Sequence, residues 1–153
     1  MTPVFMLPRE ERRVREIYKV CHPSWPDRPT DWFVAHPTLV LHHEKIVVGF
    51  TSFSLSIAPT PTLASYGDDC CYGHDVCVSP TRQGKGYGRV LADGRLAMAR
   101  HFGVKMFLGM TQETNVPMVR IFEAQGCTRY ATIPGAFPHD SPSDGIVYVK
   151  ALR

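Results

Sequence analysis

A glycine-rich turn between Cys77 and Gly88 carries the clearest chemical signal in this sequence. It reads Cys-Val-Ser-Pro-Thr-Arg-Gln-Gly-Lys-Gly-Tyr-Gly, so glycines recur at every second position from Gly84 to Gly88. Glycines leave backbone N–H groups uncovered by side chains, and the helix expected from Tyr87 directs its positive dipole end to the same place. The turn is therefore predicted to bind a diphosphate.

Two common phosphate-binding motifs do not fit this turn. A nucleoside-triphosphate loop needs Lys followed by Ser or Thr after its last glycine, but Gly88 is followed by Arg89 and Val90. A dinucleotide fingerprint needs its third glycine three residues after the second, and Arg89 stands at that position.

The turn instead fits the pattern Gln/Arg-x-x-Gly-x-Gly over Gln83–Gly88, with Val78 and Pro80 before it and Asn115 downstream. With these residues the chain resembles the GNAT superfamily of N-acetyltransferases. The resemblance is good over roughly residues 70–130 and holds elsewhere only in the order of elements. It implies a transferase, specifically an acyltransferase, that uses acetyl-CoA as co-substrate and moves the acetyl group directly to a primary amine in a ternary complex.

The resemblance also implies which residues bind coenzyme A. Main-chain groups at the end of a strand are expected to pair with the pantetheine arm, and the turn is expected to wrap the pyrophosphate, with cationic side chains beside it. The cofactor-binding residues expected on this basis are Cys77, Val78, Arg82, Gln83, Gly84, Lys85, Gly86, Tyr87, Gly88, Asn115 and Phe122.

A primary amine is protonated at neutral pH, so its attack on a thioester requires a base near the reacting carbonyl. His74 titrates in a suitable range. Strand alternation predicts that it shares a face with Tyr72, Val76 and Val78, opposite Asp75. In the arylalkylamine branch of the superfamily, two strand histidines assist deprotonation, and the resemblance places His74 at one position and Tyr72 at the other. Both are predicted to be catalytic, and the alternative is that His74 only packs in the core.

Phe122 stands where the resemblance would place the tyrosine that protonates the departing thiolate. A thiolate is a tolerable leaving group, because thiol pKa values lie within about two units of neutrality. Transfer can therefore proceed with water or Tyr130 as a weak substitute. The same departure supports an alternative function, a catalytically weak or silent acyl-CoA-binding module that acts through a partner.

Four residues suggest a zinc site at first sight, namely Cys70, Cys71, His74 and Cys77. In an extended strand, however, residues three apart lie roughly 10 Å apart on opposite faces and cannot share one ion. No metal site is therefore expected.

The elements that must position these residues follow from hydrophobic periodicity. Helices are predicted over Arg9–Cys21, Tyr87–Phe102 and Val116–Gln125, with a further helical turn over Asp31–Ala35. Strands are predicted over Val4–Leu7, Thr38–His43, Ile46–Ile57, Cys70–Val78, Val104–Met110, Cys127–Ile133 and Gly145–Leu152, with loops at Ala58–Asp69 and Pro134–Asp144. The expected fold class is α/β (mixed α+β), a GNAT-like, mostly antiparallel central sheet of six to seven strands flanked by about four helices, in a single acetyltransferase domain over residues 1–153.

Composition excludes several classes of protein. Of 153 residues, 44% are hydrophobic and 20% charged, and no apolar run approaches the roughly 18 residues of a membrane span. The net charge of +3 is scattered, which argues against a nucleic-acid partner. Five irregularly spaced cysteines argue against a disulfide framework and for a reducing, cytoplasmic location. The acceptor is expected to be a small-molecule amine or a protein amine, and a homodimer is expected through the edge of the last strands.

Overall fold

The computed structural model describes residues 1–55, 69–139 and 143–152. The loop predicted at Ala58–Asp69 lies outside the described residues except for Asp69. The strands are β1 (Val4–Phe5), β2 (Thr38–His43), β3 (Ile46–Leu55), β4 (Cys70–Val78), β5 (Met106–Gln112), β6 (Thr128–Phe137) and β7 (Ser143–Ala151). The helices are α1 (Glu11–Cys21), α2 (Trp32–Ala35), α3 (Tyr87–His101) and α4 (Val116–Ala124), with 3-10 turns at Pro8–Glu10 and Pro80–Arg82.

The strands that the structure describes form a sheet in the order β1-β2-β3-β4-β5-β7-β6. The pairings of β1 with β2, β2 with β3, β5 with β7 and β6 with β7 are antiparallel, and β4 with β5 is parallel. The predicted fold class, a mixed α/β fold with a mostly antiparallel sheet, is therefore confirmed. The described residues form two compact units. The elements β3, β4 and α3 each contribute residues to both units.

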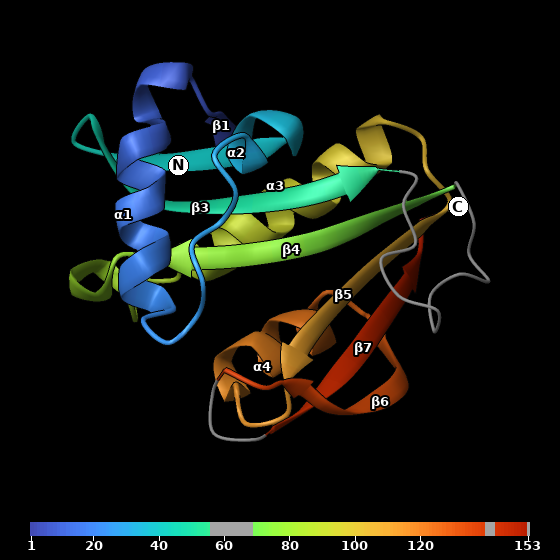
Figure 1. Ribbon diagram of the computed structural model, residues 1–153. Coiled ribbons are helices and arrows are strands. Elements are labelled where there is room, and N and C mark those ends of the chain that lie inside the picture. Colours follow the sequence, from blue (N-terminus) through green and yellow to red (C-terminus); the bar gives the residue numbers. More distant parts are fainter. Residues whose placement is uncertain (56–68, 140–142, 153) are drawn as a thin grey trace. The chain divides into compact units, whose positions relative to one another are not determined.

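The first unit comprises Met1–Phe53 and His74–Leu96. Helix α1 and its following segment cover one face of β2, β3 and the end of β4, and α3 covers the other face, as Figure 1 shows. The apolar stripe of α1 buries Val14, Ile17 and Tyr18 in a cluster with Cys77 of β4. On the opposite face, the core is built around Leu91 of α3.

Strands β3 and β4 approach each other closely where β4 ends. A Cβ atom added at Gly49 would lie 2.7 Å from the carbonyl oxygen of Cys77 and 2.9 Å from a methyl carbon of Leu91. Real Cβ atoms are not found so close to backbone oxygen, so the absence of a side chain at Gly49 permits this packing. The hairpin before it turns through Glu44 and Lys45, both with positive φ (50° and 67°).

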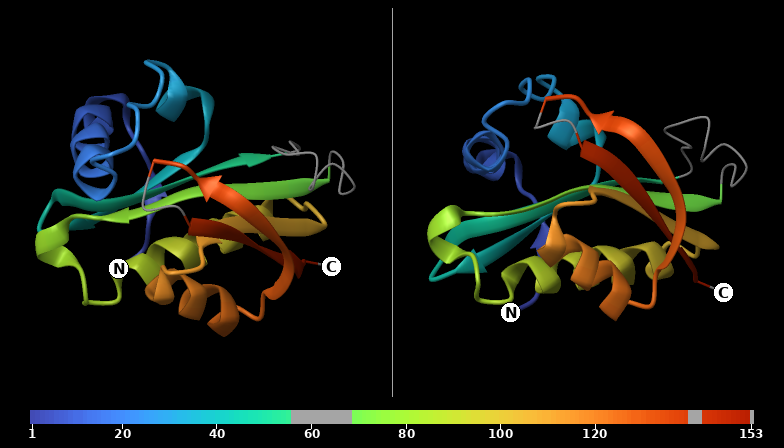
Figure 2. Two further views of the ribbon diagram at one scale, coloured as in Figure 1. Left: turned by 60° about the horizontal axis from the view of Figure 1, so that its bottom comes forward. Right: turned by 90° about the horizontal axis from the view of Figure 1, so that it is seen from below.

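The second unit comprises Ser54–Gly73 and Ala97–Arg153. Helix α4 packs on β5 and β7, where the buried Phe122 stacks on Tyr148 with ring centroids 4.8 Å apart. Figure 2 shows this helix beside the two strands. A Cβ atom at Gly109 of β5 would lie 2.6 Å from the Phe122 ring, so a glycine is needed under this aromatic core.

The loop predicted to begin at Pro134 begins later, because β6 continues to Phe137. The β6–β7 register shifts between Ile133 and Phe137, and Gly135 there has a φ of 63°. The Gly135 N–H donates to the Asp144 carboxylate at 3.1 Å. A glycine and a proline therefore mark an irregularity inside a strand here, and not the end of the strand.

None of the helices within the described ranges is both long and apolar enough to cross a membrane.

Candidate active site

The glycine turn joins β4 to α3 in the first unit. After Val78 the chain makes the 3-10 turn Pro80–Arg82, then passes through Gly84 (φ 75°) and Gly86 (φ 83°) before α3 begins. A Cβ atom added at either glycine would meet nothing within 4 Å. The backbone amides of the turn are therefore not crowded by neighbouring atoms, and the first turn of a helix leaves N–H groups without intrahelical acceptors.

Internal hydrogen bonds hold the shape of this turn. The Gln83 side-chain amide donates to the Val78 carbonyl at 3.0 Å, and the Ser79 N–H donates to the Val48 carbonyl at 2.8 Å. The Tyr87 hydroxyl lies 3.1 Å from Nδ1 of His43. Among the residues predicted to bind the cofactor, Gln83 and Tyr87 thus have structural contacts of their own.

Two cationic side chains flank the turn. Arg82 is partly exposed and Lys85 is exposed. Both are long and flexible, so they can follow a bound anion, and they add positive charge to that of the helix end. This arrangement of amides and cations is compatible with a diphosphate, and the binding role of the turn stays a prediction.

His74 lies among aromatic rings that come from the segment after α1. Its ring centroid is 5.1 Å from that of Trp32 and 5.2 Å from that of His36, both in edge-to-face geometry. Trp32 and His36 stack on each other at 3.8 Å. Burial lowers the pKa of His74 to about 4, against the opposing effect of Asp75 and with smaller lowering by His36, Arg28 and Arg95. The imidazole is therefore neutral at physiological pH.

Next to His74, a buried ion pair joins β4 to the segment between α1 and α2. Nη2 of Arg28 lies 3.0 and 3.2 Å from the two carboxylate oxygens of Asp75. Asp75 is only 4% exposed, and the Ser52 hydroxyl also donates to it at 3.0 Å. The Arg28 guanidinium lies over the Trp32 ring, 4.1 Å from its centroid. Arg28 thus links the carboxylate to the ring that contacts His74.

The side chains of β4 do not alternate along its whole length, so the predicted face assignment was partly wrong. Val76 and Val78 pack with Leu91 of α3, whereas His74 contacts Trp32 of α2 and Asp75 contacts Arg28, which precedes α2. The ladder between β4 and β5 ends at Gly73, so the following residues are not held by that ladder. His74 therefore does not share a face with Val76 and Val78, and it lies on the same side as Asp75.

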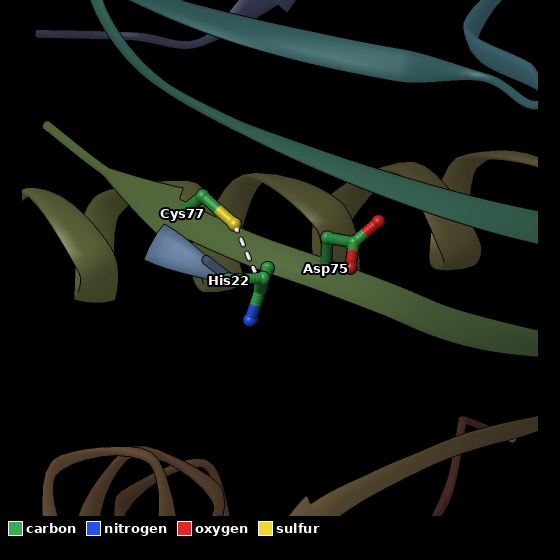
Figure 3. Close-up of side chains that lie close together, drawn as sticks. All are labelled: His22, Asp75 and Cys77. Carbon is green, nitrogen blue, oxygen red and sulfur yellow. Dashed lines mark hydrogen bonds between the residues drawn. The ribbon is translucent and has the colours of Figure 1, made fainter. Parts of the chain in front are cut away.

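A contact between Cys77 of β4 and His22 was not predicted from the sequence. The Cys77 sulfur lies 3.4 Å from Nε2 of His22, the residue that follows α1. Figure 3 shows the His22 ring facing Cys77, with Asp75 two residues earlier on the same strand. Four side chains reach β4 from the proline-rich segment that follows α1, namely those of His22, Arg28, Trp32 and His36. This segment has no hydrophobic periodicity, and only its density of aromatic residues suggested a functional role.

The remaining predicted site residues belong to the second unit. Tyr72 is buried in a cluster with Cys70, Leu108 and Val147. Asn115 caps α4, because its side-chain oxygen accepts from the Met118 N–H at 3.3 Å. Phe122 is 1% exposed in the aromatic core described above. These placements give each residue a structural role, and their roles toward substrate stay predictions.

Comparison of the sequence with known proteins identifies the family of this chain. A model of the acetyltransferase (GNAT) family matches residues 8–127. A curated relative, the L-methionine sulfoximine/L-methionine sulfone acetyltransferase of Salmonella typhimurium, is 29% identical over 136 residues, covering 79% of this chain and 76% of the relative.

Solved structures of other proteins have a fold similar to that of this chain. A candidate acetyltransferase from Salmonella typhimurium, solved with its cofactor acetyl-CoA, superposes with a TM-score of 0.81 at 24% identity, covering 99% of this chain and 94% of that one. An N-acetyltransferase from Staphylococcus aureus Mu50 also gives a TM-score of 0.81, at 16% identity, covering 99% of this chain and 98% of that one.

Proposed function

The chain belongs to the acetyltransferase (GNAT) family, and from this premise we propose that it transfers an acetyl group from acetyl-CoA to the primary amine of a small molecule, directly and in a ternary complex. Members of this family use acetyl-CoA as co-substrate, and one structural neighbour contains it. The observation that carries the proposal is the turn from Gln83 to Gly88, in which Gly84 and Gly86 have the positive φ angles of an amide cradle.

The proposed chemistry begins with a neutral amine. The amine nitrogen attacks the thioester carbonyl, the carbon–sulfur bond breaks, and coenzyme A leaves as a thiolate. His74 is proposed to take the proton that the nitrogen loses. With a pKa of about 4 it is a weak base toward a free ammonium group, whose pKa is about 10. It is a competent acceptor once attack has made the nitrogen acidic, because its imidazole is already neutral.

The acceptor is proposed to be a small amino acid-like amine. The relative at 29% identity is named for methionine sulfoximine and methionine sulfone, which are small molecules with one primary amine. A protein amine is the less favoured acceptor. The five cysteines are all free thiols, which supports the proposal that the protein works in the reducing cytoplasm.

One observation favours a second function. Phe122 occupies the position of the expected acid and is buried in the aromatic core of the second unit, so this position cannot protonate the leaving thiolate. A module that binds acyl-CoA and releases no product would show the same residue. His74 favours catalysis, because its neutral imidazole can accept a proton and a pure binding module does not need a proton acceptor.

The test is amine-dependent acetylation by the purified protein, followed by mass spectrometry of the product and by release of coenzyme A. The panel contains methionine sulfoximine, methionine sulfone, lysine, spermidine, an aminoglycoside and a peptide with a free N-terminus. His74→Ala is compared with His101→Ala, which changes an exposed histidine at the end of α3. We expect kcat to fall by about 100-fold or more in His74→Ala alone, with acetyl-CoA affinity unchanged.

Each outcome separates the alternatives. Tight acetyl-CoA binding without product from any amine would favour the silent module. Activity of His74→Ala within about threefold of the wild type would remove His74 from the mechanism and leave the transferase intact. Circular dichroism of each variant shows whether a loss of activity reflects a loss of folding.

A further inference from the structure

Two buried N–H donors near His74 have no hydrogen-bond acceptor among the residues that the structure describes. They are Nε of Arg28 and Nε1 of Trp32, and both atoms are shielded from solvent. A buried donor has given up its water and gains nothing in return unless it meets an acceptor, so such atoms are rare in proteins and call for an explanation. A ligand that brings an oxygen atom to this place would satisfy them.

The two donors belong to groups that lie on each other. The central guanidinium carbon of Arg28 is 4.1 Å from the centroid of the Trp32 ring. Because Nε is bonded to this carbon and Nε1 is a member of this ring, the two nitrogen atoms are no more than about 7 Å apart. A carboxylate can span this separation, since each of its two oxygens accepts hydrogen bonds at about 2.9 Å. One carboxylate can therefore satisfy both donors.

The side chains that carry these donors are already held by other contacts. Nη2 of Arg28 lies 3.0 and 3.2 Å from the two carboxylate oxygens of Asp75. The Trp32 ring stacks on His36 with ring centroids 3.8 Å apart. A ligand would thus meet donors that are fixed beforehand, and less conformational entropy would be lost when it binds.

The backbone of this segment is held by Arg15 of α1. The Arg15 guanidinium donates at 2.7–2.9 Å to the carbonyl oxygens of three successive residues, Arg28, Pro29 and Thr30. It also pairs with Glu11 at 2.8 Å. Five prolines and no hydrophobic periodicity mark the stretch from 22 to 37, so these bonds to a helix replace the restraint that regular structure would give.

The distance between Trp32 and His74 suits an α-amino acid. The two ring centroids are 5.1 Å apart. In an α-amino acid only two carbon atoms separate the amine nitrogen from a carboxylate oxygen, which places these atoms about 3 Å apart. With its carboxylate at the two donors, such a molecule therefore has its amine within reach of the His74 imidazole.

The charges of this group of side chains favour the same class of ligand. Arg28 and Asp75 form an ion pair, and His74 is neutral at physiological pH. An α-amino acid is also neutral overall, because its carboxylate and its ammonium group cancel. It adds no uncompensated charge to a partly buried place, whereas an amine without a carboxylate adds one positive charge.

We propose that Arg28 and Trp32 bind the carboxylate of a free α-amino acid and thereby place its α-amine at His74. This inference rests on the proposed acetyl transfer, and it narrows the acceptor from an amino acid-like amine to an amine with an adjacent free carboxylate. A site built to hydrogen-bond one group of its substrate rejects analogues that lack the group, because its donors then stay unpaired.

The test compares three α-amino acids with the amines that lack only the carboxylate. The amino acids are methionine sulfone, leucine and phenylalanine, so polar, aliphatic and aromatic side chains are represented. For each compound, acetylation by the full-length protein gives kcat and KM, and calorimetry in the presence of coenzyme A gives the affinity without turnover. We expect the wild type to favour at least one amino acid over its matched amine by about 100-fold or more, about tenfold for each hydrogen bond to the carboxylate.

Trp32→Phe is the main variant, because it removes the N–H donor and keeps an aromatic ring beside His36 and His74. Arg28→Lys removes the second donor and keeps a positive charge beside Asp75. Trp25→Phe is the matched control, the same substitution in the same segment at a ring that stacks on His22. We expect Trp32→Phe and Arg28→Lys to weaken use of the amino acid by about tenfold or more, mainly through KM, and to change use of the matched amine by less than about threefold.

The matched amine separates carboxylate binding from a structural role, because a misplaced segment would impair both members of a pair. The proposal is overturned if the wild type uses or binds both members of every pair within about threefold, as expected if the two donors hold only water. It is also overturned if Trp32→Phe weakens both members equally, or if Trp25→Phe causes the same selective loss.

The two readouts separate this site from the proposed transferase. Acetylation of amines without preference for a carboxylate would overturn the site and leave the transferase. Selective binding of an amino acid that Trp32→Phe abolishes, with no acetylation of any compound, would support the site and overturn the transferase. A wild-type protein that neither binds nor acetylates any of the six compounds would overturn both.

Discussion

Gly86→Ala tests whether the amides of the glycine turn bind the cofactor. Gly86 has a φ of 83°, and Gly103, at the end of α3, has a φ of 74°. Neither position has an atom within 4 Å of an added Cβ. Gly103→Ala is therefore a matched control, because both variants carry the same backbone penalty and neither creates an internal clash.

The two variants should be destabilised to a similar degree. A left-handed conformation costs an L-residue about 1–2 kcal/mol, which corresponds to a fall of roughly 2–8 °C in the thermal midpoint for a chain of this size. Cofactor affinity should differ. If Ala shifts the turn so that two charge-assisted hydrogen bonds to the diphosphate are lost, at about 1.5–3 kcal/mol each, the loss is about 3–6 kcal/mol. This corresponds to roughly 100- to 10,000-fold weaker binding.

Isothermal titration calorimetry with coenzyme A and acetyl-CoA measures the affinity, and thermal unfolding measures the stability. We expect Gly86→Ala to lose binding and Gly103→Ala to keep it within about threefold. Binding by folded Gly86→Ala at nearly wild-type affinity would refute the role of the turn. Equal loss in both variants would show that general destabilisation, and not the turn, explains the effect.

Two further predictions concern stability. The Glu10 carboxylate accepts from the Leu7 N–H at 2.8 Å and lies 2.6 Å from Nε2 of His42, and these contacts lower its pKa against the opposing effect of burial. A lowered pKa stabilises the fold above the unfolded value of about 4.3, and this stabilisation is lost as the pH falls through the folded pKa. Glu10→Gln should therefore cost about 1 kcal/mol at pH 7 and progressively less as the pH is lowered below about 4.3, measured by urea unfolding. Gly109→Ala should cost about 1–3 kcal/mol, because its Cβ would lie 2.6 Å from the Phe122 ring. An unchanged urea midpoint would show that the ring moves aside freely.

The sequence predicted those elements whose signal is local. The bounds of β4 were predicted residue for residue, since a run of apolar residues ends at a glycine turn, and α1 followed from its apolar stripe. The end of β6 was not predicted, because Pro134 and Gly135 normally end a strand. There, pairing with β7 and a hydrogen bond from Gly135 to Asp144 keep the strand going.

The site was predicted less completely than the fold. Single residues such as His74 were predicted because their chemistry can be recognised in the sequence, and their roles stay predictions. Their partners were not predicted, since His22 and Arg28 lie in a segment without periodicity and meet β4 only through tertiary packing. The pair of Cys77 with His22 joins residues 55 positions apart, and no local pattern reports such a distance.

The break in alternation at His74 and Asp75 affects the charge state of the proposed base. With strict alternation, His74 would lie on the side of Val76 and Val78, away from the side that Asp75 shares with Cys77. Because the two residues share a side, the Asp75 carboxylate would favour an imidazolium at His74, a form that cannot accept the proton of an amine. Arg28 lies on the same carboxylate and offsets its charge, so burial decides the outcome and His74 is neutral. Burial is the largest influence on the pKa of His74 and Arg28 adds a smaller lowering, so the proposed proton acceptor is neutral at physiological pH.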